Sequence, residues 1–471
     1  MKARVLGPPG AAQTSAVGLA LGLMGFFLAG LTSAEEPRVV EPTSARDAAV
    51  FALPEVTDPL LEPVPRPRRE VTSFREAREL LERRSPDLAL ARADVERARG
   101  ILRQSLAGAL PSITSTASLA GRPLQPTLIP TLTPPSYTYL AQIVASERIV
   151  APATWKLIGA SERDVERAQL SAEDMRRRVY GGLAEALLGV VVTERAAELA
   201  RDGLRSSLQT LTLWTRRHDV GVGTELDLAR LSQDVASARL ALIERTEAVR
   251  RAHEALGMAL GTVEPWGLSA VVDAAAVESS VRASCAPQAG PNARPDVAAA
   301  LVSVDVAERM VKKTQAEFAP TVDLVTTIGM QPASFASTEP AANVQIAGVV
   351  TFSIWDGGAR YGSLRIARAN VDAAHARHDR VRREAELQAS QATRAIGVAE
   401  AALSAARDSR DRARDADRLV RAALRVGVGS TLDLVQAQAL LRRTDTEVAL
   451  REYEVVRAKV EQFLLTSRCS P

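Results

Sequence analysis

Val220-Gly221-Val222-Gly223-Thr224 returns later in the chain as Val426-Gly427-Val428-Gly429-Ser430, and in both places Leu-Asp-Leu follows one residue further on. The two copies lie 206 residues apart. Each copy follows a long run of helix-forming residues, and its glycines allow the chain to reverse direction. The stretch therefore predicts a helix-to-helix turn that occurs twice in one chain.

Prolines mark a second pair of repeated boundaries. Pro86 begins a predicted helix that ends before Pro111, and Pro295 begins one that ends before Pro320, because proline cannot continue a helix. We predict these helices over 86–110 and 295–319. Both prolines of the second pair lie 209 residues after their counterparts. Two nearly equal spacings, each shared by several landmarks, indicate a tandem duplication with a three-residue slip in a loop.

Extended segments follow each proline-bounded helix. We predict strands over 112–120 and 137–150 in the first half, and over 321–330 and 343–355 in the second. Apolar residues alternate clearly in the second half. One predicted face carries Val322, Leu324, Thr326 and Ile328, and its partner strand carries Val344, Ile346, Val350, Phe352 and Ile354.

A heptad pattern of small residues runs through the helix that follows each strand pair. Steps of three and four from Leu364 to Ala423 reach mostly alanine, and the matching series from Ile158 to Trp214 is rich in Ala, Gly and Ser. Such a pattern predicts supercoiled helices with closely approaching backbones. At about 1.5 Å per residue each helix would be roughly 90 Å long. Helices this long and this charged are predicted to project into an aqueous compartment.

The N-terminus predicts export. Lys2 and Arg4 precede an apolar stretch over 16–31, and small residues follow at 32–34, which is the pattern of a cleaved signal peptide over 1–34. An uncleaved membrane anchor is the alternative. Seven prolines lie between Glu35 and Arg69, so we predict an unstructured arm over 35–72.

Cys285 and Cys469 could form a disulfide in an oxidising compartment, and two unpaired thiols are the other possibility.

Composition and motifs argue against several function classes. The formal charge is only +3, and Arg alternates with Asp and Glu, which indicates solvated helix faces and no nucleic-acid partner. We find no metalloprotease, hydrolase or Walker motif, so we expect no enzyme activity and no cofactor. His375 and His378 lie one turn apart without a specified acidic or cysteine partner, so we predict no metal site.

Four strands per chain predict an oligomer. Lipid tolerates no unpaired backbone edge, so membrane strands must close into a barrel. Known single-chain barrels have about eight strands or more, and two or three copies would supply eight or twelve. Tyr137, Tyr139, Trp155 and Trp355 lie near predicted strand ends and are candidate membrane-interface anchors, although each could equally be a packing residue.

From about residue 74 to 465, the repeated order of helix, strand pair, long helix, turn and return helix resembles the outer membrane efflux protein (TolC-like) family. The resemblance is carried by the two turns, Ser85-Pro86-Asp87, Leu110-Pro111-Ser112 and Ile354-Trp355-Asp356-Gly357-Gly358. It implies a mostly α-helical trimer, with a twelve-stranded outer-membrane barrel and a helical tunnel in the periplasm. It also implies two repeats, 73–264 and 293–465, an equatorial segment over 265–292 and a tail over 466–471.

The resemblance assigns the two turns, about 218–226 and 425–432, to the periplasmic tip where an adaptor protein docks. The implied docking residues are Gly221, Val222, Gly223, Thr224, Gly427, Val428, Gly429 and Ser430. Asp227 and Asp433 would be gate carboxylates, whereas the alternative is that they only stabilise the helix start. Gln436 and Gly429 depart from the family at a second ring acid and at a locking Arg, which predicts a weakly locked gate.

The implied function is a passive duct of a tripartite efflux or type I secretion system. Its partners would be two further copies of the chain, outer-membrane lipid, a periplasmic adaptor and an inner-membrane pump of RND or ABC type. A periplasmic coiled-coil adaptor without a pore is the alternative, and a secreted enzyme comes last. The transported substrate cannot be predicted from these residues.

Overall fold

The computed structural model describes residues 54–121, 137–269, 272–287, 290–334 and 337–468, which belong to one compact unit. The predicted signal peptide therefore lies outside the described residues. Two short helices, α3 (Pro86–Ala107) and α7 (Pro295–Ala316), precede the strand pairs. Two long helices follow, α4 (Pro152–Asp219) and α8 (Ala359–Arg425), and they return as α5 (Glu225–Ala259) and α9 (Thr431–Leu465). No helix among the described residues is long and apolar enough to cross a membrane.

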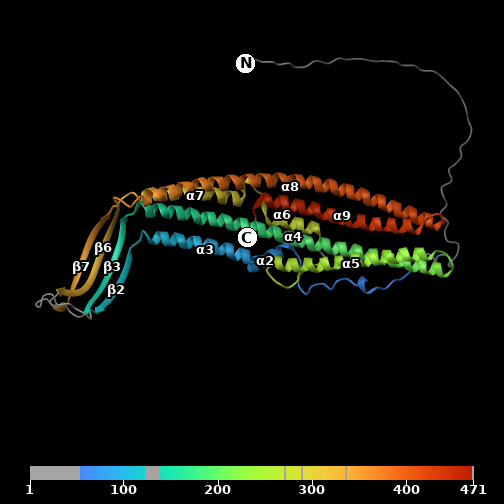
Figure 1. The fold of residues 1–471 in the computed structure, drawn as a ribbon, viewed down its shortest axis with the longest axis horizontal. Helices are drawn as coiled ribbons and strands as arrows, with labels where there is room; N and C mark the ends of the chain where they lie inside the picture. The colour runs from blue at the N-terminus through green and yellow to red at the C-terminus, as the bar shows by residue number, and fades with distance from the viewer. Residues whose placement is uncertain (1–53, 122–136, 270–271, 288–289, 335–336, 469–471) are drawn as a thin grey trace, which may run out of the picture. The chain divides into compact units, whose positions relative to one another are not determined.

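The long helices confirm the duplicated order read from the sequence. α4 and α8 contain 68 and 67 residues, and Figure 1 shows the sheet at one end of them and the two turns at the other. α4 packs against α3, α5 and α7, and α8 packs against α7 and α9. The four helices nearest the sheet thus lie side by side in the order α3, α4, α7, α8. α3 and α7 end three residues earlier than predicted, because the last residues before each proline form tight turns.

The four strands form one antiparallel sheet in the order β2, β3, β6, β7. β2 spans Ser112–Gly121, β3 spans Tyr137–Val150, β6 spans Thr321–Ser334 and β7 spans Ser337–Thr351. The prediction for the fourth strand was wrong at its end, because Phe352 and Ile354 lie beyond β7. Asp356 accepts hydrogen bonds from the amides of Gly358 (3.0 Å) and Arg360 (3.1 Å). This turn, with Gly358 at φ +90°, ends the strand region and begins α8.

The heptad seam is confirmed in α8 and only partly in α4. The buried alanines of α8 are all seam positions, namely Ala367, Ala374, Ala385, Ala392, Ala399 and Ala413. In the middle of α4 the buried residues are larger, and they include Tyr180, Leu183 and Leu187. These side chains belong to the main core, which also contains residues of α2 (Phe74–Arg84) and α6 (Ala274–Ser284). The seam prediction failed there because these helices cover a second face of α4.

The described part of the proline-rich segment is not unstructured. Asp58 accepts a hydrogen bond from Leu60 N at 2.9 Å and pairs with Arg239 on α5, also at 2.9 Å. Leu60 and Leu61 pack against a buried cluster between α4 and α5. Further on, β1 (Glu70–Val71) pairs in parallel with β4 (Gly267–Leu268). The prediction of an unstructured arm was wrong over 54–72. This segment is ordered by its contacts with α4, α5 and β4, which its own composition does not reveal.

The segment between the repeats meets the C-terminal segment. β5 (Ala286–Pro287) pairs antiparallel with β8 (Ser467–Arg468). Cys285 is buried and disulfide-bonded. Cys469, the only other cysteine in the sequence, lies outside the described residues. Its pairing with Cys285 stays a prediction, which the antiparallel β5–β8 contact supports.

Replacement of Cys285 by serine is expected to lower the free energy of unfolding by about 2–4 kcal/mol, because a disulfide restricts the unfolded chain. Denaturant titration with and without a thiol reductant measures the effect. Reductant should destabilise the wild-type protein to the level of the variant and leave the variant unchanged. Equal stability of the two proteins under oxidising conditions would contradict the disulfide.

Candidate functional site: the sheet faces and the helical tip

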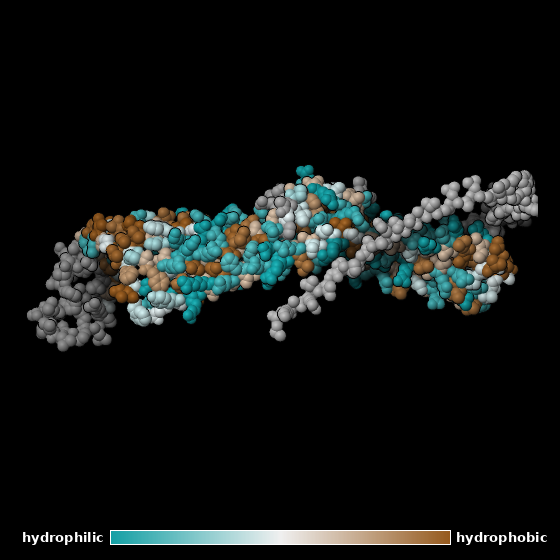
Figure 2. Space-filling model, turned by 90° about the horizontal axis from the view of Figure 1, so that it is seen from above, coloured by the Kyte–Doolittle hydropathy of each residue, from teal (hydrophilic) through white to brown (hydrophobic). Residues whose placement is uncertain are grey.

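One face of the sheet is mostly apolar, although Ser115, Thr326 and, near the helices, Glu147 also lie on it. Ile143, Ile328 and Val344 lie opposite one another on three neighbouring strands. The register also places the exposed, large apolar residues Ile113, Leu119, Leu324, Met330, Ile346 and Val350 on this face. All of these apolar side chains are exposed, and Figure 2 shows apolar residues gathered at the end that carries the sheet. The described residues of a single chain therefore leave a large apolar surface exposed, which is typical of an interaction site.

The opposite face is mostly polar. The register places Thr114, Thr116, Gln142, Thr327, Asn343 and Gln345 on it. Arg148 and Asp323 pair across β3 and β6 on the same face at 3.6 Å, although Val144, Val325 and Val349 also lie there. Alternation of an apolar and a mostly polar face is the pattern of strands that separate lipid from water.

The candidate interface aromatics lie at both ends of the sheet. Tyr137 and Tyr139 are at the start of β3, the end away from the helices, and their side chains lie outside the described residues. Trp155 is in the first turn of α4, and Trp355 lies between β7 and α8. Both tryptophan side chains are exposed. Their role as interface anchors stays a prediction.

The helical tip consists of the two repeated turns. Gly221, Gly223 and Gly427 have φ values of +83°, +115° and +82°, which only glycine adopts without strain. Gly429 lacks such a φ, but a Cβ atom there would lie 2.9 Å from the Leu424 amide nitrogen. That crowding favours glycine at this position.

Asp227 and Asp433 occupy the same place in their helices but have different partners. Thr224 and Ser430 cap α5 and α9 and accept hydrogen bonds from the amides of Asp227 (3.2 Å) and Asp433 (3.1 Å). The Asp227 carboxylate also accepts hydrogen bonds from the Thr224 amide (3.0 Å) and from the hydroxyl of Thr431 on the other turn. The hydrogen bond from Thr431, followed by those from Thr224, lowers the pKa of Asp227.

Asp227 thus joins the two turns, whereas the only hydrogen-bond partner recorded for the Asp433 carboxylate among the described residues is Ser430 (2.8 Å). This geometry favours a structural role for Asp227. An additional role at a channel entrance stays a prediction for both carboxylates.

The structure also brings together a polar group that the sequence did not reveal. Arg442 on α9 contacts Asp234 on α5 at 2.5 Å and Ser207 on α4 at 3.1 Å.

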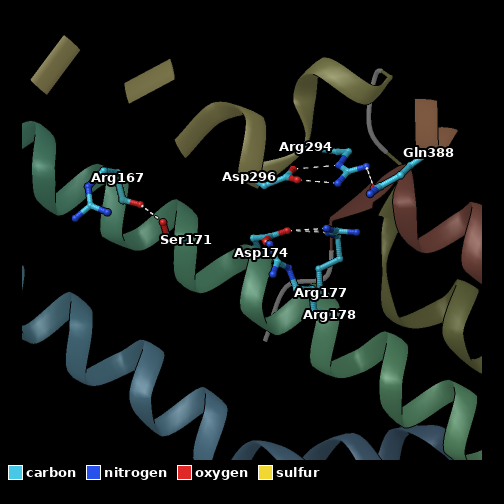
Figure 3. Close-up of polar contacts among 8 residues, drawn as sticks. All are labelled: Arg167, Ser171, Asp174, Arg177, Arg178, Arg294, Asp296 and Gln388. Carbon is cyan, nitrogen blue, oxygen red and sulfur yellow. Dashed lines mark hydrogen bonds and ion pairs between the residues drawn. The ribbon is translucent and has the colours of Figure 1, made fainter. Parts of the chain in front are cut away.

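A second polar group, also not predicted from the sequence, lies at the start of α7, next to α4 and α8 (Figure 3). Arg294, just before α7, donates two hydrogen bonds to Asp296 (3.0 and 2.7 Å) and one to Gln388 on α8 (2.9 Å). Asp174 and Arg177 on α4 pair beside it at 2.7 Å. The one available signal was that Arg294 stands where the first repeat has the helix-capping Ser85.

Known proteins resemble this chain over most of its length. The sequence profile of a family described as "Outer membrane efflux protein" matches residues 77–262 and 288–462. The structure of CusC, whose description mentions transmembrane channel formation, superposes with a TM-score of 0.74 at 16% identity, covering 88% of this chain and 99% of that chain. The outer membrane protein VceC from Vibrio cholerae superposes with a TM-score of 0.71 at 18% identity, and the match covers 84% of this chain and 97% of VceC. The Neisseria gonorrhoeae MtrE outer membrane channel superposes with a TM-score of 0.70 at 16% identity, and the match covers 88% of this chain and 97% of MtrE. A comparison with curated protein sequences finds no significant match.

Proposed function

Because the chain belongs to the outer membrane efflux protein family, we propose that it acts as a passive trimeric duct through the outer membrane. The duct would receive substrates from an inner-membrane pump of RND or ABC type through a periplasmic adaptor. No step in this function makes or breaks a covalent bond, so the absence of an enzymatic motif fits the proposal.

The two-faced sheet is the observation that carries the proposal. Four antiparallel strands in one chain leave the outer edges of β2 and β7 without a partner among the described residues. Three copies would supply twelve strands, and pairing of β7 with β2 of the next copy would satisfy every edge. The exposed apolar face would then contact lipid, and the face with Thr114, Gln142 and Gln345 would line water.

The helices supply the second half of the duct. α4 and α8 would each extend about 100 Å from the membrane at about 1.5 Å per residue. The turns around Gly221 and Gly427 lie at their far ends, which supports their assignment as the docking tip for the adaptor. We keep the two repeats, 73–264 and 293–465, as the units of the tunnel, with the segment over 265–292 and the C-terminus as an equatorial belt.

Single-channel recording in a planar lipid bilayer tests the duct. The purified protein is expected to give discrete, cation-preferring openings of uniform size. Asp433→Ala should weaken the cation preference, because a ring of three carboxylates attracts cations. Unchanged selectivity in Asp433→Ala would contradict the gate role of this residue. Silence of both the wild-type protein and variants with an altered tip turn would favour the alternative, an adaptor without a pore.

A further inference from the structure

The contact between the two repeats inside one chain has a specific chemistry. Asp305 on α7 pairs with Arg163 on α4 at 2.6 Å. Arg309, one turn along α7, also pairs with Asp305 at 3.0 Å and reaches the Gly159 carbonyl on α4 at 3.5 Å. A Cβ atom on Gly159 would lie 3.3 Å from Arg309 Nη1. The arginine of α7 therefore lies over a glycine of α4 and beside an acid of its own helix.

The tandem repeat defines the equivalent surfaces on α8 and α3. α8 repeats α4 at a spacing of 206 residues, and α3 repeats α7 at 209. Ala160 on α4 is 2% exposed, whereas its equivalent Ile366 on α8 is 64% exposed. Ala299 on α7 is 7% exposed, whereas its equivalent Leu90 on α3 is 65% exposed. At these two positions the outer helices are thus uncovered and carry larger apolar side chains than their covered equivalents.

The outer surfaces of α8 and α3 also carry one arginine, one glycine and one acidic residue at the positions equivalent to Gly159, Arg309 and Asp305. Glu96 on α3 is equivalent to Asp305, so the acid keeps its helix. Arg365 on α8 occupies the position of Gly159, and Gly100 on α3 occupies the position of Arg309. The arginine and the glycine have therefore exchanged helices. Within the described part of a single chain, a Cβ atom on Gly100 would meet no atom within 4 Å.

From this exchange we propose that α8 of one copy packs against α3 of the next copy. Arg365 of the first copy lies over Gly100 of the next copy and pairs with its Glu96. Glu96 already contacts Arg99 of its own helix at 2.6 Å, just as Asp305 contacts Arg309 while it accepts from Arg163. The proposal rests on the closed ring of copies in the proposed function and identifies the residues that join them. Around that ring, α4–α7 contacts within chains alternate with α8–α3 contacts between chains.

A cysteine pair tests the contact directly. Glu96→Cys combined with Ala369→Cys places thiols at the positions equivalent to Asp305 and Arg163. A short bismaleimide is expected to link copies into covalent dimers and trimers on a reducing denaturing gel. Arg163→Cys combined with Asp305→Cys is the matched control, because the same cross-link should then form inside one chain and leave its mass at that of a monomer.

Charge changes provide the second test. Arg365→Glu is expected to lower the yield of detergent-stable trimer about tenfold, since it faces Glu96 across a contact where like charges are costly. Adding Glu96→Arg should restore the yield. Arg368→Glu is the control, because its equivalent Glu162 on α4 remains exposed beside α7. Equal yields in Arg365→Glu and Arg368→Glu would contradict the proposed ion pair.

The two proposals can fail separately. Trimers that conduct normally but show no cross-link between positions 96 and 369, while the control pair reacts, would overturn the α8–α3 contact and leave the duct intact. Absence of any oligomer from the membrane-extracted wild-type protein would overturn the duct itself. Cross-linked dimers and trimers together with the rescue by Glu96→Arg would support the contact.

Discussion

Arg294→Met is expected to lower the free energy of unfolding by about 3–5 kcal/mol, the typical loss when one partner of a buried ion pair is removed. Arg294 is 4% exposed, and all three nitrogen atoms of its guanidinium group donate to Asp296 or Gln388 (Figure 3). The variant keeps most of the side-chain volume but leaves the Gln388 oxygen and the Asp296 carboxylate without these donors. The joint between α7 and α8 should therefore be the structure that loosens.

The loss of a direct partner for Asp296 explains why the effect should be large. Two carboxylates, Asp174 and Asp296, lie close to two little-exposed guanidinium groups, Arg177 and Arg294. Removal of Arg294 leaves Asp296 without its directly paired cation at a site where water reaches little of the carboxylate. The third arginine of the group, Arg178, is 62% exposed and pairs with Asp174 at 2.6 Å, so it does not replace Arg294. Arg177 attracts Asp296, but it already pairs with Asp174 and cannot replace the two-point contact.

Denaturant titration followed by circular dichroism measures the loss. Arg412→Met is the matched control, because Arg412 is 79% exposed and pairs at 3.2 Å with Asp408 on the same helix. Such a surface pair contributes about 0–1 kcal/mol. A loss in Arg294→Met no larger than in Arg412→Met would show that the buried group does not stabilise the joint.

The same variant has an expected pH dependence. Burial alone would raise the pKa of Asp296, but the hydrogen bonds from Arg294 and its charge, with that of Arg177, outweigh burial and lower the pKa below the ordinary 3.8. A lowered pKa adds stability above the unfolded-state value, and this stability is lost as the pH falls through the folded-state value. The stability gap between wild type and Arg294→Met should therefore narrow below about pH 4.

Local chemistry explains which parts of the fold could be predicted from the sequence. Pro86 and Pro295 begin α3 and α7 because proline fits the first helical turn, and the glycines at 221, 223 and 427 adopt positive φ in the turns. The alanine seam of α8 was readable because α8 contacts its neighbours along one stripe. Each of these features depends on residues that are close together in the chain.

The features that the sequence did not predict depend on distant residues. Asp58 is fixed by Arg239, and nothing in the proline-rich segment itself indicates that partner. The middle of α4 receives α2 and α6, so Tyr180 and Leu183 are buried outside the heptad seam. At the tip, the aspartates of both turns were singled out, but the hydrogen bond from Thr431 that distinguishes Asp227 crosses from one repeat to the other.

Ile346→Arg is expected to prevent stable insertion into membranes. Ile346 is 70% exposed in the middle of β7, on the face that we assign to lipid. An arginine at the lipid face near the bilayer midplane costs about 2–4 kcal/mol per chain, and a trimer would carry three of them in one barrel. We expect a large loss of heat-resistant trimer when the variant is folded into phosphatidylcholine vesicles.

Gln345→Arg is the matched control for this prediction, since Gln345 is the preceding residue of β7 and is also exposed, but on the opposite face. It should insert like the wild-type protein, because its side chain would meet water in the channel. Three added positive charges there should instead reduce the cation preference in single-channel recordings. If Gln345→Arg failed to insert and Ile346→Arg changed selectivity, the assignment of the two faces would be reversed. If both inserted without effect on conductance, the sheet would not form the wall of the duct.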